Sequence, residues 1–292
     1  MLVRKAQFII RLSMSPETRN WPESIDIAHF SEYGWVASPP FLPHDLLNEA
    51  AEAIEAYYLG ERDHVLPVRG FLDWRAEDGE ALRMNDYVSL QSDALRRVVC
   101  WPGIARAAAK LIAADRVRLF HDQLISKPPA SSGVNTAVGW HTDKSYWKTC
   151  SSERMLTAWI PLQDCSEACG PLAVVDGSHQ WHDTDWMSTF VVQDFGTIES
   201  RLGRPIEARS MLLQRGQISF HHARTIHGSL PNCTDQFRTA LAIHFQDGDN
   251  VYRRHTASDG TVAVHINDIL CRRLPDGDPD YADPIVCPTL WP

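Results

Sequence analysis

From Val117 onward, the sequence consists of short strand-like runs separated by turn residues, and this pattern most constrains the fold. Apolar and β-branched residues fill the runs 117–126, 156–162, 172–175, 211–213, 217–220 and 239–245. Turn residues such as Pro128-Pro129, Asp176-Gly177-Ser178 and Arg215-Gly216 lie between them. Many short strands joined by such turns are typical of a β-sandwich or a closed barrel.

The region before Val117 is predicted to be helical. Residues 44–59 place apolar side chains at helical spacing, and Gly60 ends the run. A second helix begins after Ser92, and an alanine-rich helix over 103–114 follows Trp101-Pro102. Helices followed by strands predict a mainly β fold, a double-stranded β-helix (jelly-roll, cupin-like) core buttressed by N-terminal α-helices.

We expect the whole chain, 1–292, to form a single domain. Residues 1–20 are predicted to be a flexible leader, with either Met1 or Met14 as the true start. The segment 180–210 is too long for a hairpin turn and is interpreted as a lid or insertion at the barrel rim. Residues 272–292 are rich in Pro and Asp and are expected to be a surface tail.

Composition excludes several classes of protein. The formal net charge of −9 argues against a nucleic-acid partner, because such proteins carry a basic footprint. No run approaches the roughly 20 apolar residues of a membrane-spanning helix. The seven cysteines are an odd number without a disulfide framework, which favours reduced thiols in the cytoplasm. The oligomeric state, monomer or homodimer, stays open.

Two histidines and one carboxylate have the spacing of a metal site. In His141-Thr142-Asp143 the two outer side chains point to the same face of a strand. His227 lies at the end of another predicted strand, and together the three match the 2-His-1-carboxylate triad of non-haem Fe(II) oxygenases. That triad leaves metal positions for a bidentate 2-oxo acid and for O2. Arg238 then offers a guanidinium fork for the distal carboxylate of 2-oxoglutarate.

The same residues leave two other classes open. A cupin-like metal hydrolase holds zinc with such a triad, and a non-catalytic member of the fold binds a ligand or partner with it. Arg238 argues against the hydrolase, which has no need of a carboxylate clamp at this spacing. The intact set of three ligands argues against the non-catalytic protein.

Ordered motifs then point to one family. They are Phe30-x3-Gly34-Trp35-Val36, His141-Thr142-Asp143, Trp159-Ile160-Pro161-Leu162-Gln163-Asp164, Cys169-Gly170-Pro171-Leu172, Gly177-Ser178-His179 and His227-Gly228-Ser229-Leu230-Pro231-Asn232 with Arg238. With these motifs, the stretch 30–245 resembles the phytanoyl-CoA dioxygenase-like (PhyH) branch of the Fe(II)/2-oxoglutarate-dependent oxygenases. The resemblance implies Fe(II), 2-oxoglutarate and O2 as cofactor and cosubstrates. It also implies oxidation, most simply hydroxylation, of an unactivated C–H bond, with 2-oxoglutarate converted to succinate and CO2.

The resemblance also assigns roles to residues. It implies iron ligands at His141, Asp143 and His227. It implies cosubstrate contacts at Arg238, Ser229, Gln123 and Trp159. The lysine that contacts the cosubstrate in some members has no counterpart near residues 85–90. Asp143 occupies the position that is small in halogenating members, which favours hydroxylation.

The substrate side is less defined. Substrate contacts are predicted at Tyr146, Trp147, Trp181 and Trp186, whereas scaffold roles are predicted for His179, His221 and His222. The acidic net charge favours a small metabolite, such as a natural-product intermediate, as substrate. Desaturation, cyclisation or peroxide formation with the same cofactors stays open. A basic patch at Arg201, Arg204 and Arg209 keeps an acyl-CoA hydroxylase open as well.

Overall fold

The computed structural model describes residues 20–188 and 194–292, so the predicted leader lies almost wholly outside the described residues. The helices are α1 (Ser24–Tyr33), α2 (His44–Tyr58), α3 (Asp93–Val99), α4 (Pro102–Leu111), α5 (Phe195–Leu202) and α6 (Asn267–Leu270). The predicted start of the second helix is confirmed, because the Ser92 side chain caps α3 by accepting a hydrogen bond from the Leu95 amide. Pro102 is the first residue of α4, where its missing N–H costs nothing.

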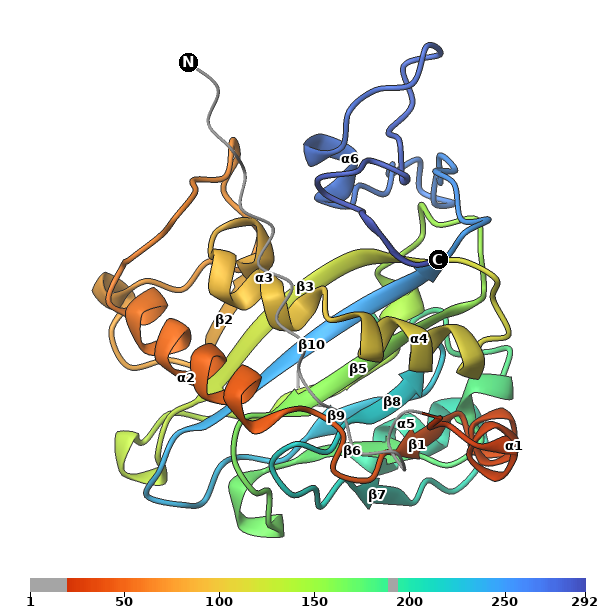
Figure 1. Cartoon of the computed structure of the whole chain (residues 1–292). Coiled ribbons are helices and arrows are strands. Elements are labelled where there is room, and N and C mark those ends of the chain that lie inside the picture. Colours follow the sequence, from red (N-terminus) through yellow and green to blue (C-terminus); the bar gives the residue numbers. More distant parts are fainter. Residues whose placement is uncertain (1–19, 189–193) are drawn as a thin grey trace, which may run out of the picture.

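Two antiparallel sheets form the core. The strands are β1 (Trp35–Ala37), β2 (Arg83–Asp86), β3 (Val117–Lys127), β4 (Val138–His141), β5 (Met155–Pro161), β6 (Leu172–Val175), β7 (Ala208–Ser210), β8 (Ser219–His222), β9 (His227–Ser229), β10 (Arg238–Asp247) and β11 (Thr289–Trp291). The large sheet has the order β1-β8-β5-β10-β3-β11, with β2 also paired to β3. The small sheet has the order β4-β9-β6-β7. Helices α2, α3 and α4 lie across one face of the large sheet (Figure 1), so the predicted jelly roll with buttressing helices is confirmed.

Alternation along the strands of the large sheet separates packing residues from site residues. On β10, Leu241, Ile243 and Phe245 pack into the core against the helices. Side chains at alternate positions point to opposite faces of a sheet, so Arg238 and His244 share the other face, which lines the interior between the two sheets. The same strand therefore supports the helix layer with one face and the candidate site with the other.

Two predicted strands differ from the observed ones. The run 211–213 is not a strand; the chain pairs three residues earlier, as β7. Met211 and Leu213 are apolar because they are buried in the core cluster with Trp159, not because they belong to a ladder. The run predicted at 217–220 begins its pairing at Ser219, because the chain first turns at Gly216, which has a φ of 98°.

Residues 272–278 are exposed, as expected of a surface tail, but part of the rest of 272–292 is buried. Tyr281, Val286 and Cys287 are buried in a second core cluster with Phe120, and β11 pairs with β3. Pro and Asp residues suggested exposure, but the carboxylate of Asp283 instead caps a turn by accepting hydrogen bonds from backbone N–H groups of Ile285 and Val286.

The described part of the 180–210 segment covers the small sheet. Ile198 and Leu202 of α5 pack with Val175 of β6 and with Trp140 of β4. Residues 189–193 of the predicted lid lie outside the described residues. A closing motion of this segment therefore stays a prediction.

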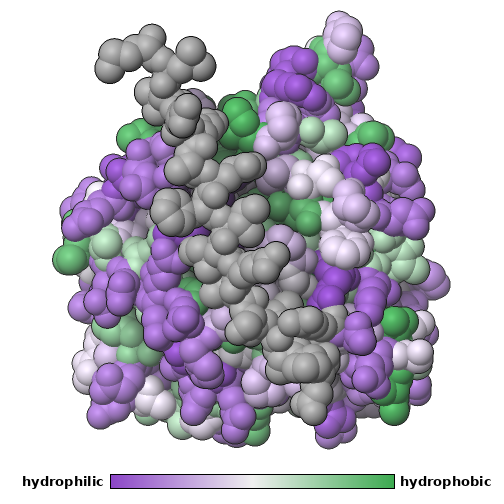
Figure 2. Space-filling model, in the orientation of Figure 1, coloured by the Kyte–Doolittle hydropathy of each residue, from purple (hydrophilic) through white to green (hydrophobic). Residues whose placement is uncertain are grey.

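The surface is mixed in character. On the face that Figure 2 shows, hydrophilic side chains predominate and apolar ones lie in small scattered patches around the grey atoms. Among the described residues, none of the helices combines the length and apolar character needed to cross a membrane.

Candidate metal and cosubstrate site

The three predicted metal ligands converge at the interior end of the small sheet. His141 ends β4 and pairs with His227, which begins β9, and Asp143 follows two residues after His141. The Asp143 Oδ1 atom lies 3.9 Å from His141 Nε2 and 3.5 Å from His227 Nε2. All three side chains are buried, and one ligand atom from each lies within 4.8 Å of the others. This is a compact donor set for one metal ion.

The two histidines are oriented for coordination by their own backbone. His141 Nδ1 donates to the Gly139 carbonyl at 2.7 Å, and His227 Nδ1 donates to the Thr225 carbonyl at 2.9 Å. Because Nδ1 carries the proton in each ring, the Nε2 lone pair is directed at the shared centre. Burial lowers the pKa of His141 to about 3 and that of His227 to about 4, so both rings are neutral, as a metal ligand must be.

The carboxylate of Asp143 is held by groups that the sequence did not predict to be part of the site. Thr157 Oγ1 donates to Asp143 Oδ2 at 2.5 Å, and His221 Nε2 lies 3.4 Å from the same oxygen. His244 Nδ1 lies 3.8 Å from that oxygen and 2.7 Å from Thr157 Oγ1. Burial alone would raise the pKa of Asp143, but the neighbouring histidines, His227 first, hold it well below its usual value. Oδ2 is thus engaged, which leaves Oδ1 facing the two predicted histidine ligands.

The scaffold role predicted for His221 is therefore wrong. This histidine lines the site because β8 places it on the interior face of the large sheet, beside Thr157 of β5. His179 instead contacts the Ser31 carbonyl through Nε2, and its ring packs near His222, away from the three ligands.

Arg238 lies at the other end of the same pocket. It is buried, its terminal nitrogen donates to the Gly170 carbonyl at 3.2 Å, and its Nε has no hydrogen-bond partner. Burial lowers the pKa of Arg238 to about 10, which leaves the guanidinium charged at neutral pH. Gly170 is required here, because its φ is 63° and a Cβ would lie 2.2 Å from the Leu230 carbonyl oxygen.

Residues of both sheets line the pocket between the three ligands and Arg238. The predicted cosubstrate contacts Ser229, Gln123 and Trp159 are all among them. The Arg238 guanidinium lies 5.6 Å from the Trp159 ring centre. The Gln123 side-chain amide donates to Asp86 Oδ1 at 2.9 Å, so its assignment as a donor to the cosubstrate stays a prediction.

A second cavity, of about 270 Å³, opens from the metal ligands in another direction. The predicted substrate contacts Tyr146 and Trp147 line it, together with Asp86 and the histidines His121, His244 and His265. Phe71 and Val264 form its rim from two segments far apart in the sequence, which rise on either side of the large sheet in Figure 1.

The other two predicted substrate contacts lie elsewhere. Trp181 and Trp186 line neither of the two cavities that reach the metal ligands. They pack near α5, with Arg204 over Trp181 and Arg201 over Trp186. Trp181 also lines a separate cavity of about 300 Å³, so substrate contacts at these two tryptophans stay a prediction. The sequence offered no signal to separate them from Tyr146 and Trp147.

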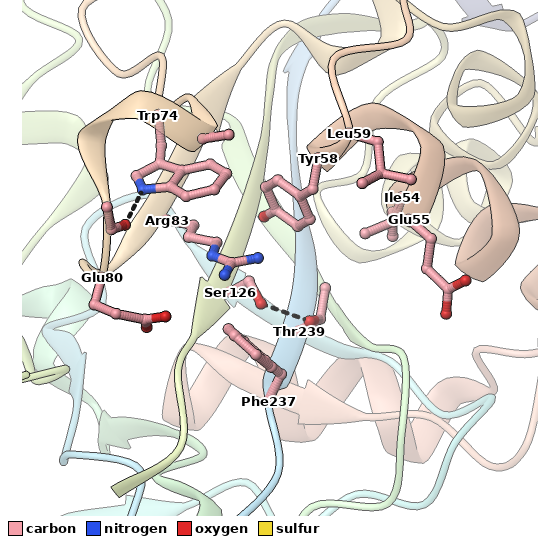
Figure 3. Close-up of a pocket in the computed structure, with 12 residues that line it drawn as sticks. Ile54, Glu55, Tyr58, Leu59, Trp74, Glu80, Arg83, Ser126, Phe237 and Thr239 are labelled. Atoms are coloured by element: carbon pink, nitrogen blue, oxygen red, sulfur yellow. Dashed lines mark hydrogen bonds between the residues drawn. The ribbon is translucent and has the colours of Figure 1, made fainter. Parts of the chain in front are cut away.

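A further cavity, of about 670 Å³, is separate from the site. It is a groove at the surface beside α2, and Figure 3 shows the Arg83 guanidinium between the rings of Trp74, Tyr58 and Phe237. We call it the Arg83 groove. None of its lining residues is a predicted site residue.

Comparisons with known proteins agree with this geometry. The chain is 27% identical over 190 residues to a probable phytanoyl-CoA dioxygenase of Caenorhabditis elegans, covering 60% of this chain and 58% of the relative. It is 26% identical over 222 residues to a 1-deoxypentalenic acid 11-beta-hydroxylase of Streptomyces exfoliatus, covering 70% and 72%. The chain thus spans about half the length of the phytanoyl-CoA dioxygenases that it matches.

A solved structure and a family profile complete the comparison. The fold resembles that of the non-heme alpha ketoglutarate dependent carbocyclase SnoK from nogalamycin biosynthesis, with a TM-score of 0.67 at 22% identity, covering 91% of this chain and 96% of that one. The profile of the phytanoyl-CoA dioxygenase (PhyH) family matches residues 30–240, which is most of the chain. The chain therefore belongs to the phytanoyl-CoA dioxygenase (PhyH) family.

Proposed function

We propose that this protein is an Fe(II)- and 2-oxoglutarate-dependent dioxygenase that oxidises a C–H bond of a small metabolite. One observation carries the proposal. Two neutral histidine Nε2 atoms and Asp143 Oδ1 converge at one end of a buried pocket, and a charged Arg238, which has no carboxylate partner in residues 20–188 and 194–292, lies at the other end. A metal ion at one end and a carboxylate at the other match the two ends of a metal-chelating 2-oxo dicarboxylate.

The residues present fit an Fe(II) ion. Two imidazoles and one carboxylate form the facial triad that leaves positions open on the metal. When bound, Fe(II) would supply the activation of O2 that accompanies conversion of 2-oxoglutarate to succinate and CO2.

The chain's own residues supply orientation and exclude water. Gly139 and Thr225 fix the two histidine rings through their carbonyl oxygens, and Thr157 fixes the carboxylate. Arg238 and Ser229 would bind the distal carboxylate, and Trp159 walls the pocket between them and the metal ligands. Burial on all sides keeps water from competing for these groups.

The Arg238 guanidinium, which has no carboxylate partner among the described residues, also separates this proposal from the alternatives. A hydrolase on the same fold has no use for a buried guanidinium beside its metal, and such a group without an anion is costly. A non-catalytic protein would not need both histidines held with Nε2 directed towards the Asp143 carboxylate.

The cavity lined by Tyr146 and Trp147 favours a small, largely apolar substrate. Among the described residues, its lining includes no lysine or arginine, whereas Asp86 and Asp143 both line it. Burial lowers the pKa of His244 to about 3 and holds that of His265 well below its usual value, so these two rings add no positive charge at neutral pH. Phe71 and Val264 at the rim are 71% and 55% exposed, which suits contact with a hydrocarbon or ring system.

The arginines that could bind the phosphates of an acyl-CoA are engaged by other side chains. The basic patch predicted at Arg201, Arg204 and Arg209 is already engaged: Arg201 stacks on Trp186, Arg204 stacks on Trp181, and Arg209 pairs with Asp176 at 3.0 Å. We therefore favour a small metabolite over an acyl-CoA.

The reaction class is tested by adding Fe(II) and 2-oxoglutarate to the protein without oxygen. The proposal predicts a visible charge-transfer absorption band, and succinate when air is admitted. Candidate substrates are then screened by mass spectrometry for a gain of one oxygen, or for a loss of two hydrogens if the outcome is desaturation or cyclisation. A protein that binds Fe(II) but gives neither the band nor succinate would refute the proposal.

A further inference from the structure

Two buried basic side chains face each other in the β3–β10 ladder. Lys127 and Arg238 are paired in register, and their side chains are 0% and 3% exposed. Opposite residues of an antiparallel pair point to the same face, and like charges at such positions repel each other. Among the described residues, no carboxylate forms an ion pair with either of them. Such an arrangement is stable only with an anion nearby or with one charge removed.

Lys127 reaches from the large sheet to the small one. Its Nζ donates to Ser229 Oγ at 2.6 Å and to the Leu230 carbonyl at 2.5 Å. Because the Ser229 oxygen accepts this hydrogen bond, the hydroxyl hydrogen of Ser229 is free to point to a different acceptor. Ser229 lines the pocket with Arg238, so that acceptor lies in the pocket.

We propose that Lys127 is a positioning residue for the distal carboxylate of the 2-oxo dicarboxylate, holding Ser229 as a hydrogen-bond donor and adding positive charge beside Arg238. The inference rests on the proposed function. Lys127 lies on β3, whereas some members of the family carry a cosubstrate lysine in the region that corresponds to residues 85–90.

The electrostatics of the pocket agree with this placement. Burial first, and then the charge of Arg238, lower the pKa of Lys127 to about 6. The groups that face it are Arg238 of β10, Ser229 and Leu230 at the end of β9, and the thiols of Cys165, Cys169 and Cys233. At neutral pH the side chain is therefore mostly an amine in the ligand-free protein. A bound carboxylate favours the ammonium form, so the amine gains one proton from the buffer when the dicarboxylate binds.

The test compares K127M with K110M. Lys110 of α4 also donates to two backbone carbonyl oxygens, those of Asn20 and Pro22, but lies outside the pocket. Each Fe(II)-loaded protein is titrated without oxygen with 2-oxoglutarate, and separately with pyruvate, which lacks the distal carboxylate. We expect K127M to weaken 2-oxoglutarate binding about 10- to 100-fold, the scale of one charge-assisted hydrogen bond. Pyruvate binding should be unchanged in K127M, and both ligands should bind normally to K110M.

Two further readouts separate positioning from folding. Calorimetry in buffers of different ionisation enthalpy should show proton uptake on 2-oxoglutarate binding to the wild-type protein at pH 7.5 and a smaller uptake with K127M. In a double-mutant cycle, the losses caused by K127M and S229A should be less than additive, because part of the effect of Lys127 passes through Ser229. If K127M does not fold, as judged by circular dichroism, K127Q replaces it in the same measurements.

The outcomes are distinct. Unchanged 2-oxoglutarate binding in K127M, or an equal loss of 2-oxoglutarate and pyruvate binding, overturns the positioning role. Wild-type protein that binds neither ligand overturns the proposed function itself.

Discussion

Arg238 and Arg83 look alike in their contacts and differ in their access to water. Each guanidinium lies over a tryptophan ring, Trp159 for Arg238 and Trp74 for Arg83, and the Nε of each has no hydrogen-bond partner. Arg83 is half-buried at the wall of an open groove, whereas Arg238 is buried between the two sheets.

The difference in solvent access shows when a cation without a counter-charge indicates a ligand site: when the cation is buried away from water. In the Arg83 groove, water can solvate the charge, and stacking on three aromatic rings is a sufficient reason for the arginine. Between the two sheets, water is excluded and the neighbouring Lys127 offers no negative charge, so the buried Arg238 cation lacks a counter-charge until an anionic ligand binds. The predictions below test this contrast.

The largest expected effect is on cosubstrate binding in R238M. Removing one partner of a buried charge pair costs about 2–5 kcal/mol, which corresponds to roughly 30- to 5,000-fold weaker 2-oxoglutarate binding. The dissociation constant is measured by anaerobic titration of the Fe(II)-loaded protein. R83M is the matched control and should bind 2-oxoglutarate like the wild type. Equal losses in the two variants would remove the distinction between the two arginines.

The second effect is on stability at mildly acidic pH. In the metal-free protein, His141, His227 and His244 have pKa values of about 3, 4 and 3, below the ordinary value of 6.5. Between these values the unfolded chain binds more protons than the folded one, so stability falls as the pH falls below 6.5. Each histidine should cost about 1 kcal/mol between pH 6.5 and 5.5, and together they should lower the Tm by on the order of 5–10 °C.

Thermal melts of the metal-free protein across this range measure the effect. Because none of these histidines lines the Arg83 groove, R83M should follow the wild-type pH profile. A Tm that stays flat between pH 6.5 and 5.5 would contradict the neutral, buried state assigned to the three histidines.

The third effect is on metal affinity in T157V. Valine keeps the shape of Thr157 but removes the hydrogen bond to Asp143 Oδ2. Loss of such an outer hydrogen bond should weaken Fe(II) binding about 10- to 100-fold in a competition titration. S126A removes the Ser126–Thr239 hydrogen bond in the Arg83 groove and should leave Fe(II) affinity unchanged. Equal Fe(II) affinity in T157V and wild type would show that Thr157 does not orient the carboxylate.

The smallest effect is on stability in R83M. Cation–π contacts at exposed sites contribute about 0.5–1 kcal/mol, so the free energy of unfolding should fall by that amount in chemical denaturation. R238M, measured without cosubstrate, should instead be at least as stable as the wild type, because the replaced cation is buried without a counter-charge. A reversed order of the two stabilities would argue against the contrast drawn here.

Much of the fold could be predicted from the sequence because its local signals agree with the tertiary structure. The apolar spacing of α2, the Ser92 cap of α3 and the Pro102 start of α4 are local features, and all three are present. The run 211–213 was wrongly predicted to be a strand, because its apolar residues are buried in a core cluster and do not pair with a neighbouring strand. The buried part of the tail was not predicted, since Tyr281 and the short apolar run 285–287 lie among Pro and Asp residues that suggested exposure.

The part of the site that could be predicted consists of residues whose type and order along the chain form recognisable motifs. The motif around His141 and Asp143, followed by His227 and Arg238, names residues that the structure places around one pocket. Thr157, His244 and Lys127 were missed because each lies in an ordinary strand, with its role set by the partner strand. The one signal available was that side chains two residues apart on a strand point to the same face. On that basis Thr157 shares a face with Trp159, and His244 shares a face with Arg238.

The most direct measurement of the central claim is succinate formation from 2-oxoglutarate by the Fe(II)-loaded protein in air, wild type beside H141A. The account predicts succinate and CO2 from the wild type, and none above background from H141A, because that variant lacks one of three metal ligands. Undiminished turnover by H141A, or no turnover by a wild-type protein that binds both Fe(II) and 2-oxoglutarate, would contradict the assignment of this site.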